Sequence, residues 1–137
     1  MSETHSINTG TCLCGAVAYE ISGNLGLFQY CHCSRCRKVT GSAFAANLFV
    51  APTQFKWTQG EDKVGRYELE NAKHFASSFC TQCGSNLPWL TQTGKDMVVL
   101  ADTSNQVRNI KAKAYKNYVR CATWEEWVSE ENAYEEL

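Results

Sequence analysis

Apolar and polar side chains alternate with a period of two residues along much of this chain. Val17, Tyr19 and Ile21 share one face of an expected strand, and Phe55 and Trp57 repeat the pattern further on. Such alternation is typical of a strand with one buried face. The strands expected from this pattern and from short apolar runs cover residues 16–21, 27–30, 43–50, 55–57, 64–69, 73–79, 87–90, 97–100 and 110–119. Turn residues separate these short segments, which predicts a mainly antiparallel β domain.

Two short helical segments are expected beside the strands. Residues 39–42 have the composition of a helical turn that a glycine closes. Thr123 and Glu126 match a capping box, and Trp124, Trp127 and Val128 would then lie on one face of a C-terminal helix. The sequence therefore predicts a mainly β fold that ends in a short helix.

The size and composition of the chain favour one globular domain over residues 1–137. Its 137 residues fall within the usual ~100–200 residues of one domain, and 44% of them are hydrophobic while 20% are charged. No apolar run approaches the ~18 residues that a membrane helix needs, and the N-terminus lacks the basic and apolar regions of a signal peptide. We therefore expect a cytoplasmic protein that does not associate with membranes.

Charge is unevenly distributed along the chain. The net charge is −1, but six of the 14 acidic residues lie in the last 13 positions. The preceding part holds all 13 basic residues and eight acidic ones, a net charge of +5. Such a basic body can attract a small anion or a nucleic acid, although a solvated surface with an acidic terminal helix fits equally well. The basic residues form no dense run, so nucleic acid is the less expected partner.

Eight cysteines carry the most specific signal in the sequence. Seven of them are spaced C-x-C, C-x-C-x-x-C and C-x-x-C, which favours metal binding over disulfide bonds in a chain without a signal peptide. The middle cluster comprises Cys31, Cys33 and Cys36. These three thiolates can hold one zinc ion and leave its fourth tetrahedral position open, as in a reactive zinc site.

The seven clustered cysteines can be divided between metal ions in more than one way. The outer cysteines are Cys12, Cys14, Cys80 and Cys83. The favoured partition gives the middle cluster its own ion, because local ligands cost the least closure entropy, and lets the outer pairs complete a four-cysteine site. A competing partition joins the first pair to the first two cysteines of the middle cluster and leaves Cys36 with the last pair. A single ion held by four of these cysteines is a third possibility.

Three further residues near these clusters have alternative interpretations. Cys121 stands alone and is either a fourth ligand of the open site or an ordinary buried thiol. His32 is expected to point away from the sulfurs of its neighbours and to pack or hydrogen-bond. His74 is either structural or a proton shuttle.

The cysteine clusters and their neighbours resemble the glutathione-dependent formaldehyde-activating enzyme family, whose domain centromere protein V shares. The matching segments are TCLCG at 11–15, CHCSRCRK at 31–38, GSAF at 41–44 and FCTQCGS at 79–85. The resemblance extends over about residues 9–124 and implies a small β-tent of two antiparallel sheets organised around zinc sites. It also implies two zinc ions per chain, a structural one at the outer four cysteines and a catalytic one at the middle three.

The activity that this resemblance implies is that of a carbon–sulfur lyase similar to S-(hydroxymethyl)glutathione synthase. Such an enzyme adds a thiol such as glutathione to formaldehyde or a related aldehyde. Arg35, Arg37 and Lys38 are candidates to bind the carboxylates of the thiol, or else are solvated surface charges. The alternatives are a non-catalytic zinc-binding module for nucleic acid or protein, and a different lyase or thiol carrier.

One departure from the family pattern bears on the substrate. The family often carries a histidine shortly before a late tryptophan, whereas residues 115–119 read YKNYV, with no histidine near Lys116, before Trp124. If that histidine helps to select a substrate, this chain uses a different one.

Overall fold

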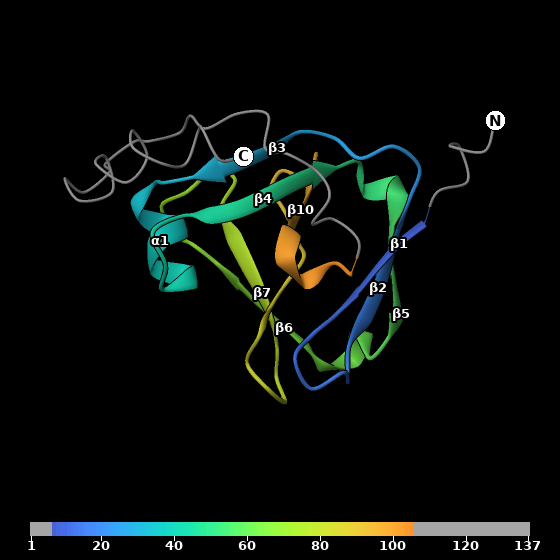
Figure 1. The fold of residues 1–137 in the computed structure, drawn as a ribbon. Coiled ribbons are helices and arrows are strands. Elements are labelled where there is room, and N and C mark those ends of the chain that lie inside the picture. The colour runs from blue at the N-terminus through green and yellow to red at the C-terminus, as the bar shows by residue number, and fades with distance from the viewer. Residues whose placement is uncertain (1–6, 106–137) are drawn as a thin grey trace.

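Residues 7–105 are described by a computed structural model, in which ten strands form three antiparallel sheets (Figure 1). The strands of the first half are β1 (Ile7–Thr11), β2 (Ala18–Ser22), β3 (Phe28–Cys31), β4 (Ala45–Val50) and β5 (Phe55–Gln59). Those of the second half are β6 (Val64–Glu68), β7 (Ala76–Cys80), β8 (Asn86–Leu87), β9 (Trp89–Leu90) and β10 (Met97–Leu100). The helical segments are α1 (Ser34–Thr40), η2 (Pro52–Gln54), η3 (Glu61–Lys63) and η4 (Ala101–Thr103).

The sheets confirm the expected mainly β class. Their strand orders are β1-β2-β5, β3-β4-β10-β9 and β6-β7-β8, and every pairing is antiparallel. There are thus three small sheets in the described part of the chain, where the resemblance implied two. The expected strand at 110–119 and the expected C-terminal helix lie outside the described residues.

The main core lies between the first two sheets. Alternate residues of β2 are buried, as its sequence pattern predicts. Tyr19 and Ile21 from this strand pack with side chains of β4 and β10, among them Leu48 and Val99. Full burial of an aliphatic side chain stabilises the fold by about 1.5–3 kcal/mol, so this contact fixes the second sheet relative to the first.

Strand β1 was not expected, because four of its five residues are polar or glycine. It pairs with β2 in a register that places Gly10 opposite Tyr19. A Cβ atom at Gly10 would overlap the Tyr19 ring. That ring is 1% exposed, and its hydroxyl donates to Thr103 Oγ1 at 2.6 Å. The absence of a Cβ atom at Gly10 therefore allows the Tyr19 ring to pack at this edge of the core.

Helix α1 begins five residues before the helical turn expected at 39–42. Cys33 occupies its N-cap with extended backbone angles, two residues after the last strand residue, Cys31. Gly41 ends the helix in the left-handed region at φ 67°, and its N–H donates to the Arg37 carbonyl at 2.8 Å. Cys36 is the buried residue of α1. The short helix thus places the C-x-x-C segment at a strand-to-helix junction.

Two further expectations need correction. The expected strand at 87–90 is divided at Pro88, which has no N–H to donate and separates β8 from β9. The expected strand at 73–79 begins only at Ala76, so His74 lies in the bend that precedes β7. No helix among residues 7–105 is both long and apolar enough to cross a membrane.

Candidate metal centres

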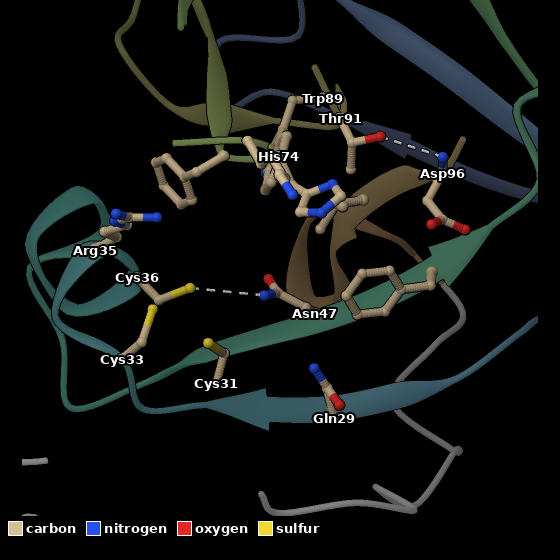
Figure 2. A pocket seen from close by; sticks show the side chains of 14 residues that line it. Gln29, Cys31, Cys33, Arg35, Cys36, Asn47, His74, Trp89, Thr91 and Asp96 are labelled. Carbon is tan, nitrogen blue, oxygen red and sulfur yellow. Dashed lines mark hydrogen bonds between the residues drawn. The ribbon is translucent and has the colours of Figure 1, made fainter. Parts of the chain in front are cut away.

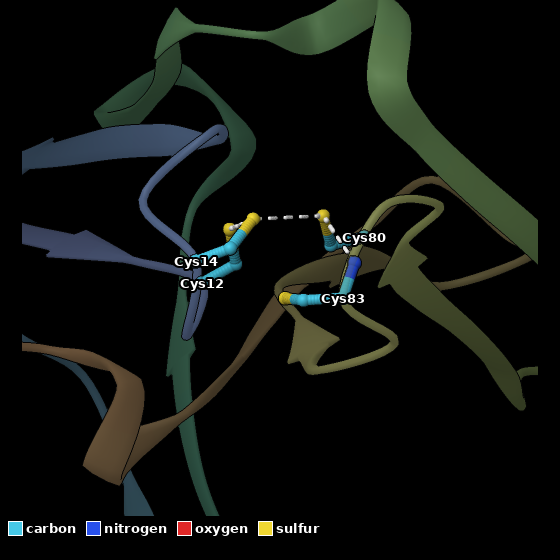
Figure 3. A group of neighbouring side chains, drawn as sticks. All are labelled: Cys12, Cys14, Cys80 and Cys83. Carbon is cyan, nitrogen blue, oxygen red and sulfur yellow. Dashed lines mark hydrogen bonds between the residues drawn. The ribbon is translucent and has the colours of Figure 1, made fainter.

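The outer four cysteines converge from two turns that are distant in the sequence (Figure 3). Cys12 and Cys14 follow β1, whereas Cys80 ends β7 and Cys83 lies in the next turn. Their four Sγ atoms all lie within 4.8 Å of one another. The Sγ atom of Cys14 is 3.7 Å from that of Cys12 and 3.9 Å from that of Cys80. This spacing fits one ion at the centre of four sulfur ligands.

Glycines close both of these turns. Gly15 and Gly84 have φ angles of 82° and 80°, which side chains with a Cβ atom rarely adopt. The Gly84 N–H donates to the Cys80 carbonyl at 2.8 Å, and the Gly15 N–H donates to the Cys12 carbonyl at 3.2 Å. The sequence pattern in which a glycine directly follows each outer pair therefore has a structural reason.

Each sulfur of the four-cysteine cluster has a hydrogen-bond donor beside it. The Val17 N–H lies 3.3 Å from Cys12 Sγ, and Gln82 Nε2 lies 3.3 Å from Cys14 Sγ. The backbone N–H groups of Gln82 and Cys83 point to Cys80 Sγ at 3.3 and 3.4 Å. Donors aimed at sulfur stabilise thiolates, the form in which cysteine binds metal. The donor set and its surroundings therefore fit a metal ion held by four thiolates.

Ser85 links the two halves of this cluster. Its hydroxyl accepts a hydrogen bond from the Leu13 N–H at 2.8 Å and lies 3.1 Å from Cys83 Sγ. Hydrogen bonds from the hydroxyl and the backbone N–H of Ser85 lower the pKa of Cys83 to about 5. The Ala16 backbone lowers the pKa of Cys14, but desolvation and the neighbouring thiols outweigh it and raise that pKa to about 11. Four adjacent thiolates thus require a cation between them.

The middle three cysteines form a second cluster at the junction of β3 and α1. The Sγ atoms of Cys31, Cys33 and Cys36 lie within 4.8 Å of one another. Cys31 and Cys36 are buried and Cys33 is half-buried. Asn47, which is 5% exposed on β4, donates from Nδ2 toward Cys36 Sγ at 3.8 Å (Figure 2). The sulfur atoms of the described residues are therefore grouped as the favoured partition proposes.

The three middle thiols differ in their tendency to ionise. Hydrogen bonds from the thiols of Cys31 and Cys36, together with backbone N–H groups at the start of α1, lower the pKa of Cys33 to about 2. Contacts with the thiols of Cys31 and Cys33, together with burial, raise the pKa of Cys36 well above its usual range. Without a cation the cluster therefore holds its negative charge on Cys33, and a metal ion is needed for all three sulfurs to be thiolates.

The middle cluster opens into a pocket of about 460 Å³, a volume within the usual range of small-molecule sites (Figure 2). One wall is apolar, and in it the rings of Phe75 and Trp89 lie 5.2 Å apart. The remaining polar and charged residues that line the pocket are Gln29, Arg35, Asn47, Lys73, His74, Thr91 and Asp96. They come from β3, α1, β4, the bend before β7 and the turn between β9 and β10.

The structure separates the basic candidates near the middle cluster. Arg35 lines the pocket, whereas Arg37 and Lys38 are not among the described residues that line it. Lys73, distant in the sequence, contributes a second cation that sequence reasoning missed, and His74 enters beside it. His32 instead turns into the protein, 2% exposed, with its ring 5.3 Å from that of Phe44.

The remaining candidates, Cys121 and the segment at 115–119 with Trp124, lie outside the described residues. Asn47 and Asp96 were missed as well. Single polar residues in or beside apolar strands carry no pattern of their own, and only the pairing of the strands reveals that they line the same pocket as the cysteines.

Two comparisons with known proteins bear on this architecture. The family model described as "Glutathione-dependent formaldehyde-activating enzyme" matches residues 7–121. The fold is similar to that of a Rhodobacter sphaeroides protein known from a crystal structure, with a TM-score of 0.60 and 23% sequence identity. That similarity covers 79% of this chain and 99% of the other. At this level of identity the similarity concerns the fold.

Proposed function

Because this chain belongs to the glutathione-dependent formaldehyde-activating enzyme family, we propose that it is a zinc-dependent enzyme that adds a thiol to an aldehyde. The thiol is glutathione or a close relative, and the aldehyde is formaldehyde or a related one. The observation that carries the proposal is the three-cysteine cluster at the wall of a pocket. Three thiolates leave one position of a tetrahedral ion open to a ligand in that pocket.

The two clusters have different roles in this proposal. All-sulfur donor sets suit zinc, and we assign one ion to each cluster. Cys12, Cys14, Cys80 and Cys83 would hold a structural ion with a complete set of four ligands. Zinc at Cys31, Cys33 and Cys36 would supply the positive charge that keeps a bound thiol ionised near neutral pH.

The reaction requires one proton transfer. A carbon–sulfur bond forms, the π bond of the carbonyl breaks, and the proton of the thiol ends on the carbonyl oxygen. We assign that transfer to His74, which lines the pocket and faces the cysteines across it (Figure 2). An imidazole can accept the proton at one ring nitrogen and return it at neutral pH.

Other pocket residues position the reactants. Asn47 orients Cys36 through its hydrogen bond to the sulfur. Arg35 and Lys73 supply positive charge for the carboxylates of an anionic thiol. Arg37 and Lys38 are not among the described residues that line the pocket, so the proposal does not use them, and a role for them stays a prediction.

The proposal is tested by following adduct formation directly. Nuclear magnetic resonance with ¹³C-formaldehyde and glutathione measures the rate of exchange between free aldehyde and S-hydroxymethylglutathione. We expect the zinc-loaded protein to raise this rate and Cys36→Ser to abolish the increase, while Lys38→Gln, a change outside the pocket, leaves it intact. An exchange rate that the protein does not alter, together with no binding of glutathione in calorimetry, would refute the enzyme and favour a non-catalytic zinc module.

A further inference from the structure

Charged side chains of opposite sign stand at the two ends of the pocket. Arg35 projects from α1, beside the cysteines, whereas Asp96 lies at the far end, in the turn between β9 and β10 (Figure 2). Lys73 is the third charged residue of the lining and lies next to His74. The pocket therefore offers two cationic side chains and one anionic side chain.

Hydrogen bonds hold the bend that contains Lys73 and His74 against the turn that contains Asp96. The N–H of Gln92, in the turn that carries Asp96, donates to the His74 carbonyl at 3.0 Å. The Gln92 side chain also donates from Nε2 to the Phe75 carbonyl, at 2.6 Å. These bonds tie the bend that carries Lys73 to the turn that carries Asp96. Two of the three charged residues of the pocket lining, Lys73 and Asp96, thus lie on segments that are held together, while Arg35 lies on α1.

The turn between β9 and β10 is itself firmly closed. The Thr91 N–H donates to the Asp96 carbonyl at 3.0 Å, and the Asp96 N–H donates to Thr91 Oγ1 at 3.3 Å. The Gly94 N–H donates to the Thr91 carbonyl at 2.8 Å. The backbone that carries the Asp96 carboxylate is therefore held in place before any ligand arrives, which lowers the entropy cost of binding.

None of these three charged side chains pairs with another described residue of the protein. Within residues 7–105, no ion pair or hydrogen bond involves the side chains of Arg35, Lys73 or Asp96. The ion pairs found there join Lys56 to Glu20 and Arg66 to Glu68, away from the pocket. Charges that line a pocket without protein partners remain available to a ligand.

We propose that the pocket binds glutathione in one direction, with its glycyl carboxylate at Arg35 and its γ-glutamyl head group at Asp96 and Lys73. Glutathione carries two carboxylates and one ammonium, the complement of two cations and one anion. Its glycyl arm is the shorter one, and Arg35 is the charge nearer the cysteines that would meet the thiol. Its longer γ-glutamyl arm ends in an ammonium for Asp96 and a carboxylate for Lys73. This inference rests on the proposed function, since it assumes that glutathione is the thiol.

The test pairs each charged side chain with the ligand group that it is assigned to bind. Calorimetry on the zinc-loaded full chain measures the affinity of glutathione and of two analogues. Desamino-glutathione lacks the γ-glutamyl ammonium, and glutathione glycinamide lacks the glycyl carboxylate. We expect Asp96→Asn to weaken the binding of glutathione about five- to tenfold and the binding of desamino-glutathione less than about twofold. Arg35→Gln should weaken the binding of glutathione by a similar factor and should change the binding of glutathione glycinamide very little.

Matched controls are available on the same two elements. Lys95→Gln changes the neighbour of Asp96, and Lys38→Gln changes an exposed charge on α1. Neither residue lines the pocket, so neither variant should alter any of the three affinities by more than about twofold. The wild-type protein provides a check that needs no variant, because it should bind each analogue about five- to tenfold more weakly than glutathione.

Each outcome has a distinct meaning. If the wild-type protein binds none of the three ligands, both the direction of binding and the proposed function fail. Alternatively, the wild-type protein binds glutathione while each variant lowers the affinity for glutathione and for its matched analogue by the same factor. The proposed direction of glutathione in the pocket is then wrong, and the proposed function stands. Binding of the analogues by the wild-type protein as tightly as glutathione would likewise overturn the direction alone.

Discussion

Replacement of Cys83 by serine tests the structural role assigned to the four-cysteine cluster. This side chain is half-buried, so the change removes a sulfur ligand while it alters core packing little. The cluster joins the turn after β1 to the end of β7, and Cys14 and Cys80 within it are 66 residues apart. Cys36→Ser is the matched change in the middle cluster, whose ligands span only the short segment from Cys31 to Cys36.

The expected difference follows from loop closure. The closure cost grows as about (3/2)RT ln n, so a link across 66 residues restricts the unfolded chain by about 2 kcal/mol more than one across five. Metal binding to a site absent from the unfolded chain adds its own free energy to folding. Cys83→Ser loosens the ion that makes this link, so we expect it to lower the free energy of unfolding by up to about 2 kcal/mol more than Cys36→Ser does. For a domain of this size that is roughly 8 °C in melting temperature.

Scanning calorimetry of the zinc-loaded variants under reducing conditions measures this difference. Removal of the metal by a chelator provides the control, since wild-type and Cys83→Ser should then melt at nearly the same temperature. Equal losses of melting temperature in Cys83→Ser and Cys36→Ser, with metal present, would contradict the division into a structural and a reactive site.

Three further predictions follow from the same geometry. Elemental analysis should find two zinc ions per chain. A chelator should remove the ion of the middle cluster faster than that of the four-cysteine cluster, because three ligands leave one side of the ion open. A single ion per chain, or one release rate for both ions, would refute this prediction. Ser85→Ala should raise the pKa of Cys83 from about 5 toward its usual value. The stability that the Cys83 thiolate provides is complete above its unfolded-state pKa and is lost as pH falls through the folded pKa, so the metal-free variant should lose it at a higher pH than wild type. Mass spectrometry can follow the alkylation rate of Cys83 across pH in the metal-free wild type and in Ser85→Ala. The rate should rise at a higher pH in the variant, and equal pH profiles would contradict the prediction. His74→Asn should lower the rate of adduct formation about 10²-fold without changing glutathione affinity, and a parallel loss of affinity would assign His74 to binding instead.

The strands that the sequence predicted well are those that contribute to the core. Segment 16–21 shows the period-two pattern because alternate residues of β2 meet β4 and β10. Strand β1 lacks this pattern, since its pairing with β2 depends on a glycine beside Tyr19 rather than on apolar side chains. Helix α1 was largely missed for a similar reason, because among its seven residues only Cys36 is buried and no apolar face marks its start.

The same distinction applies to the residues of the candidate site, some of which have a local sequence pattern while others do not. Cysteine spacing identified both clusters because metal ligands occur as local pairs and triplets. Arg35 was found because it lies between two of those cysteines in the sequence. Lys73 and Asp96 reach the same pocket through strand pairing and through the contacts of Gln92, which no local pattern reveals. Predicting them requires the arrangement of the second and third sheets.

The position of the two clusters along the chain sets an order for metal capture during synthesis. All three ligands of the middle cluster have been made once residue 36 is added, whereas the four-cysteine cluster waits for residue 83. At a translation rate of about 5–20 residues per second, the interval is about 2–9 seconds. If the proposed function is right, a ribosome-bound chain can therefore bind a metal ion at the middle cluster before an ion at the four-cysteine cluster joins the β1–β2 hairpin to β7. When metal is scarce, nascent chains that have bound one ion at the middle cluster would then still lack the proposed link between the β1–β2 hairpin and β7.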